Sequence, residues 1–209
     1  MIISKTPYRI SFFGGGSDYP SWYLKNGGSV LSTTIDKYVY FTCKDLPPFF
    51  NHKHRIVWSN IELVRKLSEI KLKPARELLK YFRIKNGLEI HYKGDLPAMS
   101  GMGSSSVFVV GLMNLLNNYC GKKINKRQLA KQSIFFEQKT LREDCGSQDQ
   151  IAVTYGGFNK INFKVNGDFN INSFSLNNSI IKNLNKNLIL IYSGFKRTSY
   201  DIASTYINK

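Results

Sequence analysis

The chain has 209 residues, a formal net charge of +16 and hydrophobic residues at 42% of its positions. This composition suits a folded protein with a real core and excludes a disordered chain. No apolar run approaches the ~18–20 residues that span a bilayer, and the N-terminus lacks the features of a signal peptide. Cys43, Cys120 and Cys145 are far apart, so they match neither a disulfide framework nor a zinc site. We therefore expect a cytoplasmic protein.

The positive charge allows three kinds of partner: nucleic acid, a membrane surface or an anionic substrate. The lysines are scattered and form no arginine-rich run or basic helix face. Nucleic-acid binding needs a clustered footprint, so neither nucleic acid nor a membrane is expected as a partner. A generally Lys-, Asn- and Ile-rich composition explains most of the charge, and an anionic small substrate stays open.

The first half of the chain is rich in β-branched and aromatic residues, which favour strands. We expect strands at 2–3 and 8–13, a hairpin of 29–34 and 37–44 turning at Asp36, and a short strand at 54–59. Amphipathic helices are expected at 61–69 and 74–85, followed by a strand at 88–93. Pro74 suits a first helical turn and Gly87 suits a helix end.

The second half contains a strongly apolar segment, 104–119, that predicts a helix buried on most sides. A loop at 94–103 precedes it. The remaining expected elements are a helix from Asn125 to about 141, a short helix within 142–153, a hairpin of 157–164 and 168–174, a strand at 188–192 and a helix from 199. The whole chain reads as an α+β protein whose mixed sheet is covered by helices.

A Gly/Ser loop leads directly into the buried helix and is the strongest local signal. It contains Pro97, Ser100, Gly101, Met102, Gly103, Ser104, Ser105 and Ser106. Glycines let a backbone approach a ligand closely, and a helix N-terminus attracts anions. This pattern indicates a phosphate cradle, although no lysine follows as in a Walker motif. A serine-capped helix after an ordinary flexible loop is the alternative.

Two further segments carry charged groups beside turns. Arg9 lies in a strand before Gly14-Gly15-Gly16-Ser17-Asp18, where the carboxylate can hold sugar hydroxyls and the arginine can steady phosphate charge. Glu137 lies in a helix, twelve residues before Asp149. For Arg9 and Asp18 the alternative is a glycine turn with a surface salt bridge. For Glu137 it is a solvated position on the helix surface, and for Asp149 an ordinary place at a helix N-terminus.

These three elements, in this order, resemble the GHMP family of small-molecule kinases, which includes galactokinase, homoserine kinase, mevalonate kinase and phosphomevalonate kinase. The family's first motif has an arginine nine residues before an Asp-Tyr pair, as Arg9 and Asp18-Tyr19 do here. Its second is a Pro-initiated Gly/Ser loop, matched by 97–106. Its sugar kinases place a glutamate twelve residues before the aspartate of a Cys-Gly-x-x-Asp-Gln segment, matched by Glu137 and 145–150.

The glycine triplet at 14–16 narrows the resemblance to the heptose kinases. The segments 28–40, 51–55 and 192–199 are similar to those enzymes as well. This implies phosphorylation of D-glycero-D-manno-heptose 7-phosphate at its anomeric hydroxyl, toward nucleotide-activated heptose for surface polysaccharide. Fucose kinases share part of the pattern and remain an alternative.

The resemblance also implies roles for individual residues. Residues 97 and 100–106 would hold ATP, Ser105 and Glu137 would hold Mg²⁺, Asp149 would accept the proton and Arg9 would stabilise the phosphoryl group. The residues implied for the sugar phosphate are Gly15, Gly16, Ser17, Asp18, Arg55, Gly146 and Arg197.

The chain departs from the family in length, since family members are substantially longer. Their third glycine-rich motif has no match after residue 157. We expect a nucleotide-binding domain at 1–180, resembling a ribosomal-protein domain, and the truncated start of a C-terminal α/β domain at 181–209. A chain lacking part of a cleft wall exposes apolar surface, so homodimers are possible. An inactive, binding-only fragment and an RNA-binding protein are the rival classes.

Overall fold

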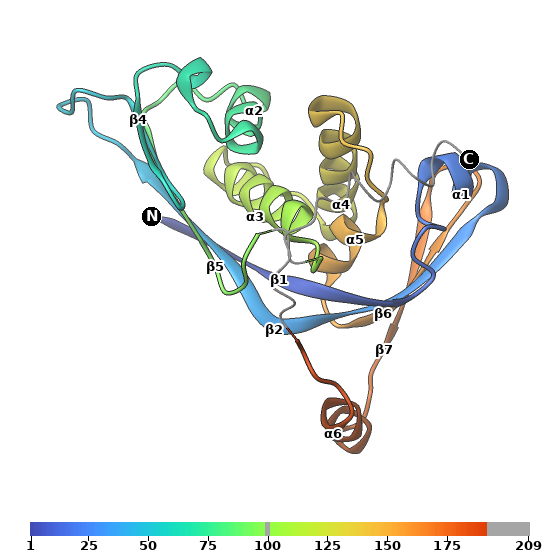
Figure 1. The fold of residues 1–209 in the computed structure, drawn as a ribbon. Coiled ribbons are helices and arrows are strands. Elements are labelled where there is room, and N and C mark those ends of the chain that lie inside the picture. The colour runs from blue at the N-terminus through green and yellow to red at the C-terminus, as the bar shows by residue number, and fades with distance from the viewer. Residues whose placement is uncertain (99–100, 192–209) are drawn as a thin grey trace.

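The computed structural model describes residues 1–98 and 101–191. They form a curved sheet with helices α2 to α5 on one face (Figure 1). Seven strands pair within these residues, in the order β4-β3-β5-β2-β6-β7, and β1 pairs with the opposite edge of β2. All pairs are antiparallel except β3 with β5. The strands are β1 Ile2–Phe13, β2 Gly28–Asp45, β3 His54–Val57, β4 Ile61–Val64, β5 Leu88–Gly94, β6 Phe158–Phe163 and β7 Phe169–Phe174.

Strand β2 corrects the expected hairpin at 29–44. It is one continuous strand that pairs with β6 through its first half and with β5 through its second. Opposite it, β1 shifts register between Pro7, paired with Tyr38, and Arg9, paired with Thr34. The residues around Asp36 therefore form a bulge rather than a turn, and the β-branched and aromatic residues on both sides keep the strand extended.

The helices supply most of the core. They are α1 Pro20–Asn26, η1 Leu67–Glu69, α2 Lys73–Tyr81, α3 Ser104–Tyr119, α4 Lys126–Phe135, η2 Phe136–Leu141, α5 Gln148–Tyr155 and α6 Asn178–Lys186. Helix α3 is buried on most sides, as its composition predicts. At Gly111 it comes so close to the sheet that an added β-carbon would lie 2.9 Å from Thr6 Oγ1.

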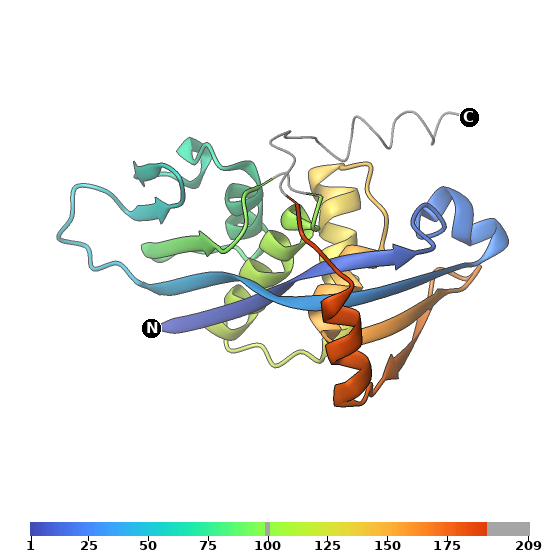
Figure 2. The same cartoon turned by 60° about the horizontal axis from the view of Figure 1, so that its bottom comes forward.

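Two other expectations about elements are wrong. The helix expected at 61–69 is strand β4 followed by the 3₁₀ turn η1, because Ile61 to Val64 alternate in exposure and pair with β3. The strand expected at 188–192 is absent among its described residues, 188–191, and Tyr192 lies outside them. Helix α6 lies directly before these residues in the chain. It covers the face of the sheet that the other helices leave open (Figures 1 and 2). The helix expected from 199 also lies outside the described residues.

None of the described helices is long and apolar enough to cross a membrane. Helix α6 runs across residue 180, where the sequence predicts a domain boundary, and that boundary stays a prediction.

Candidate functional site

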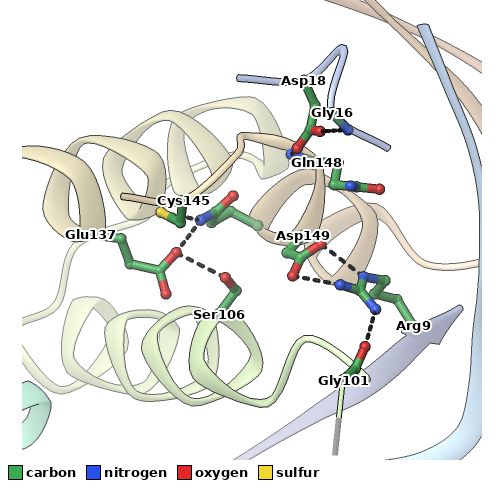
Figure 3. Close-up of polar contacts among 10 residues, drawn as sticks. Arg9, Gly16, Asp18, Gly101, Ser106, Glu137, Cys145, Gln148 and Asp149 are labelled. Atoms are coloured by element: carbon green, nitrogen blue, oxygen red, sulfur yellow. Dashed lines mark hydrogen bonds and ion pairs between the residues drawn. The ribbon is translucent and has the colours of Figure 1, made fainter. Parts of the chain in front are cut away.

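The first component of the site is an ion pair between Arg9 on β1 and Asp149 in the first turn of α5. Arg9 Nε donates to Asp149 Oδ1 and Arg9 Nη2 donates to Asp149 Oδ2, both at 2.7 Å. The remaining Arg9 nitrogen, Nη1, donates to the carbonyl of Gly101 at 2.9 Å (Figure 3). Planar two-point pairing fixes the orientation of both groups. The arginine thus connects α5 to the loop that opens α3.

The second component is the N-terminal end of α3 with the loop before it, residues 101–106, which we call the mouth of α3. Gly101 and Gly103 have positive φ values of 74° and 73°, and Gly103 is the residue that precedes the helix. Ser104, Ser105 and Ser106 form the first turn, and the first backbone N–H groups of a helix point outward from its N-terminus. A β-carbon on Gly103 would lie 3.1 Å from Asp149 Oδ2, so the aspartate lies directly beside this anion-attracting end.

The third component is Glu137, which lies in a π-helical segment, η2, and is 0% exposed. Its Oε2 accepts hydrogen bonds from Gln150 Nε2 and, at 2.8 Å, from Ser106 Oγ. Its Oε1 has no partner among the described residues. Burial raises the pKa of Glu137 to about 8, and the charges of Glu143 and Asp149 contribute in the same direction.

The hydroxyl that contacts Glu137 is that of Ser106, whereas the resemblance places Ser105 with Glu137 at Mg²⁺, and that metal role stays a prediction. Ser105 Oγ donates to Glu143 Oε2 at 3.4 Å, whereas Ser106 Oγ donates to Glu137. Consecutive helix residues point about 100° apart, so only one of the two serines can face the buried glutamate. Burial also raises the pKa of Glu143, while its bond with Ser105 acts in the opposite direction.

The orphaned Glu137 Oε1 is the observation that tests whether these residues suit Mg²⁺. A buried carboxylate oxygen without a partner is unfavourable, and a divalent cation would supply one. The described residues contain no group of three His, Cys, Asp or Glu side chains arranged for a metal. Mg²⁺ commonly binds one or two carboxylates together with substrate phosphates, which fits a single glutamate beside a phosphate cradle.

The glycine triplet forms a tight turn packed against β2. Gly14 has φ 86°, and a β-carbon there would lie 1.9 Å from the carbonyl oxygen of Ser29. The Ser17 hydroxyl is used within this turn, donating to the carbonyl oxygens of Gly14 and Ser29. The Ser17 hydroxyl thus stabilises the turn, and the substrate role expected for Ser17 stays a prediction.

Asp18 is buried, with 1% exposure, and both carboxylate oxygens accept backbone hydrogen bonds. Its Oδ1 takes the N–H of Gly16 at 3.1 Å and its Oδ2 takes the N–H of Gln148 at 3.2 Å. Burial raises its pKa, which the Gln148 and Gly16 bonds oppose. A β-carbon on Gly146 would lie 1.9 Å from Asp18 Oδ2, so that glycine allows the close approach. Asp18 therefore joins the glycine turn to α5, and its role toward a sugar stays a prediction.

An open cleft of about 420 Å³ lies against Arg9, the glycine turn and the loop that opens α3, and neither Asp149 nor Glu137 is among its lining residues. Its lining residues are Arg9, Ile10, Ser11, Phe12, Phe13, Gly14, Gly15, Gly101, Met102 and Gln148. Gln148 was not singled out in the sequence, although its place directly before Asp149 in a helix-opening turn was a usable signal.

Some predicted residues lie elsewhere. Arg55 is on β3, toward the opposite end of the sheet, where its guanidinium lies 3.4 Å from Glu89 Oε2 and it does not line the cleft. Pro97 is exposed in the loop before α3. Ser100 and Arg197 lie outside the described residues.

Comparisons with known proteins find kinases that are similar to this chain in sequence and in fold. Residues 66–157 match the family described as GHMP kinases N terminal domain. The chain is 28% identical over 210 residues to D-glycero-alpha-D-manno-heptose 7-phosphate kinase of Campylobacter jejuni, covering 96% of this chain and 62% of that protein. It is 27% identical over 165 residues to the galactokinase of Pyrococcus furiosus, covering 74% of this chain and 44% of that protein.

Among solved structures, a D-glycero-D-manno-heptose 1-phosphate kinase from Bacteroides thetaiotaomicron is similar with a TM-score of 0.79 and 24% identity. That match covers 87% of this chain and 62% of the other. The chain therefore spans less than two thirds of the length of each of these three proteins.

Proposed function

We propose that the chain is a member of the GHMP kinase family and forms the nucleotide-binding and catalytic part of an ATP-dependent sugar kinase, because residues 66–157 match that family's N-terminal domain and a heptose 7-phosphate kinase is 28% identical. The acceptor that we propose is a heptose phosphate, phosphorylated at its anomeric hydroxyl. A fucose kinase is the second candidate, since the sequence shares part of that pattern. The observation that carries the proposal is the position of Asp149, oriented by Arg9 and directly beside the mouth of α3.

In this proposal the α3 mouth binds the nucleotide. The backbone N–H groups at 103–106 and the serine hydroxyls hold phosphate oxygens, and the glycines leave room for them. Glu137, with the hydroxyl of Ser106 or Ser105, holds Mg²⁺. A magnesium ion held there would offset the negative charge that develops during phosphoryl transfer.

The acceptor hydroxyl approaches from the cleft. Asp149 takes its proton as the sugar oxygen forms a bond to the γ-phosphorus and the bond from that phosphorus to the bridging oxygen breaks, which releases ADP. Arg9 keeps the carboxylate in place through two hydrogen bonds and puts a positive charge beside the transferring group. No covalent enzyme intermediate is needed.

A direct test is to incubate the chain with Mg-ATP and a panel of sugars. The panel contains D-glycero-D-manno-heptose 7-phosphate, the free heptose, fucose and galactose, and ADP release and phosphorus NMR report turnover and the phosphorylated position. A new anomeric phosphate on the heptose phosphate supports the proposal. Preferred turnover of fucose would support the second candidate, and ATP binding without turnover of any sugar would contradict both.

A further inference from the structure

Gln148 lines the cleft, and the proposed mechanism gives its polar side chain no role. Gln148 begins α5 and directly precedes Asp149. Its backbone N–H donates to Asp18 Oδ2, so the carboxylate that holds the Gly16 turn also fixes the position of Gln148. Figure 3 shows its side chain between that turn and the Arg9–Asp149 pair.

The carboxamide of Gln148 has an unmet hydrogen bond. Its Oε1 is shielded from solvent and has no partner among the described residues. Buried polar atoms nearly always have a partner, and an exception needs a reason. A carboxamide offers donors at one end and an acceptor at the other, and it turns about its last torsion, so either end can face the cleft.

Gly15, which has no side chain, lies across from the Gln148 amide in the cleft. Gly15 lines the cleft, and the nearest atom to a β-carbon built on it is Gln148 Nε2, at 3.8 Å. Gly14 and Gly16 have positive φ values, whereas Gly15 does not. The backbone at Gly15 therefore does not require glycine. The missing side chain instead keeps space open in front of the Gln148 amide.

We propose that Gln148 is a substrate-binding residue that determines which sugars are accepted. Its carboxamide hydrogen-bonds a hydroxyl of the acceptor next to the one that loses its proton to Asp149. This inference rests on the proposed function, because that function places the reacting hydroxyl at Asp149. A site built to hydrogen-bond a hydroxyl discriminates strongly against substrates that lack it.

Two substitutions test the inference from opposite sides. Gln148→Met keeps the side-chain length and removes both polar ends, and Gly15→Ala keeps the amide but adds a methyl group 3.8 Å from its nitrogen. Gln132→Met on α4 is the matched control, because it makes the same chemical change outside the cleft. Thermal unfolding of each variant checks the fold.

The readout is steady-state kinetics on the sugar panel, extended by an analogue that lacks the hydroxyl next to the reacting carbon. We expect both cleft variants to raise the KM for the preferred sugar roughly 10- to 100-fold, with a smaller change in kcat and an unchanged KM for ATP. The KM for the deoxy analogue should change little between wild type and Gln148→Met, because the analogue lacks the hydroxyl that would hydrogen-bond to Gln148. Gln132→Met should behave as wild type.

The possible failures are distinguishable. If the wild type turns over a sugar and both cleft variants keep its KM within about twofold, the Gln148 inference is overturned and the proposed function stands. An equal rise in the KM for ATP, or the same loss in Gln132→Met, would assign the effect to the fold and also overturn it. A wild-type chain that phosphorylates no sugar of the panel overturns the proposed function and this inference with it.

Discussion

Asp149 and Glu137 are two carboxylates beside the same helix end, and their surroundings are opposite. Both oxygens of Asp149 receive a hydrogen bond from Arg9, and its side chain is 22% exposed. Glu137 has no cation as a partner among the described residues and is fully buried, with one oxygen bonded and the other orphaned. The same functional group is thus paired with a cation and partly exposed in one place, and unpaired with a cation and fully buried in the other.

This difference indicates how one short stretch of chain can supply two chemical roles. A carboxylate fixed by an arginine is already in position to receive a proton. A carboxylate buried without a counter-charge favours the arrival of a cation or a proton. The predictions below test whether the two residues are as different as their surroundings.

The largest effect is expected for Asp149→Asn. The amide cannot accept the acceptor's proton, so kcat should fall roughly 10²- to 10⁴-fold. ATP affinity, measured by calorimetry, should change little because the α3 mouth is intact. Near-wild-type turnover of the preferred sugar would show that Asp149 is not the base.

Glu137→Gln should act on the metal rather than on the proton transfer. We expect the Mg²⁺ concentration for half-maximal activity to rise roughly 10- to 100-fold, as for other changes around a metal site. The variant should be as stable as wild type or more so, because a neutral amide replaces a buried acid. An unchanged Mg²⁺ requirement would remove Glu137 from the metal site.

The pH dependence of stability should separate the two carboxylates further. Because burial raises the pKa of Glu137 to about 8, the folded chain holds a proton that the unfolded chain releases above its ordinary value of 4.5. The free energy of unfolding of wild type, relative to Glu137→Gln, should therefore fall as the pH rises from about 4.5 to about 8, by at most ~1.4 kcal/mol per pH unit.

Urea unfolding of both proteins in chelator at several pH values measures this difference. The comparison with Glu137→Gln cancels the contributions of other titrating groups. A difference that stays constant across this range would show that Glu137 is ionised in the fold.

The smallest effects distinguish the two serines. Ser106→Ala removes the 2.8 Å hydrogen bond to buried Glu137 and should lower the free energy of unfolding by about 1–3 kcal/mol. Ser105→Ala removes only a 3.4 Å contact at an exposed site and should change it by less than about 0.5 kcal/mol. Chemical denaturation of the two variants checks the order, and the reverse order would contradict the hydrogen-bond assignment.

Local patterns predicted much of the fold. The apolar run of α3 and the hairpin of β6 and β7 are confirmed, because each is determined by contacts close in sequence. Residues 28–45 and 61–64 were misread, since their structure depends on distant partners: β2 is held by β1, β5 and β6, and β4 by β3. Propensity contains no information about such partners.

In the candidate site, too, the sequence predicted some features and missed those that depend on three-dimensional arrangement. Motif spacing nominated Arg9, Asp149 and Glu137, and the structure brings all three to the start of α3. Spacing alone did not distinguish Ser106 from Ser105, because that depends on the rotation of the helix. Arg55 was placed at the sugar phosphate from its charge and the resemblance of residues 51–55, and its strand lies toward the far end of the sheet.

The pairing of β2 on both edges has a consequence for how the chain folds. Ser29 on β2 bonds to Asn162 on β6, 133 residues later, and Arg9 reaches Asp149 across 140 residues. Contacts so remote in sequence form slowly, because closing the long loop between them costs conformational entropy before the contact contributes any favourable free energy. During synthesis β2 is made well before β6, so the edge of β2 that β6 covers stays unpaired until β6 has been made. The site likewise cannot be complete before α5 brings Asp149 to Arg9.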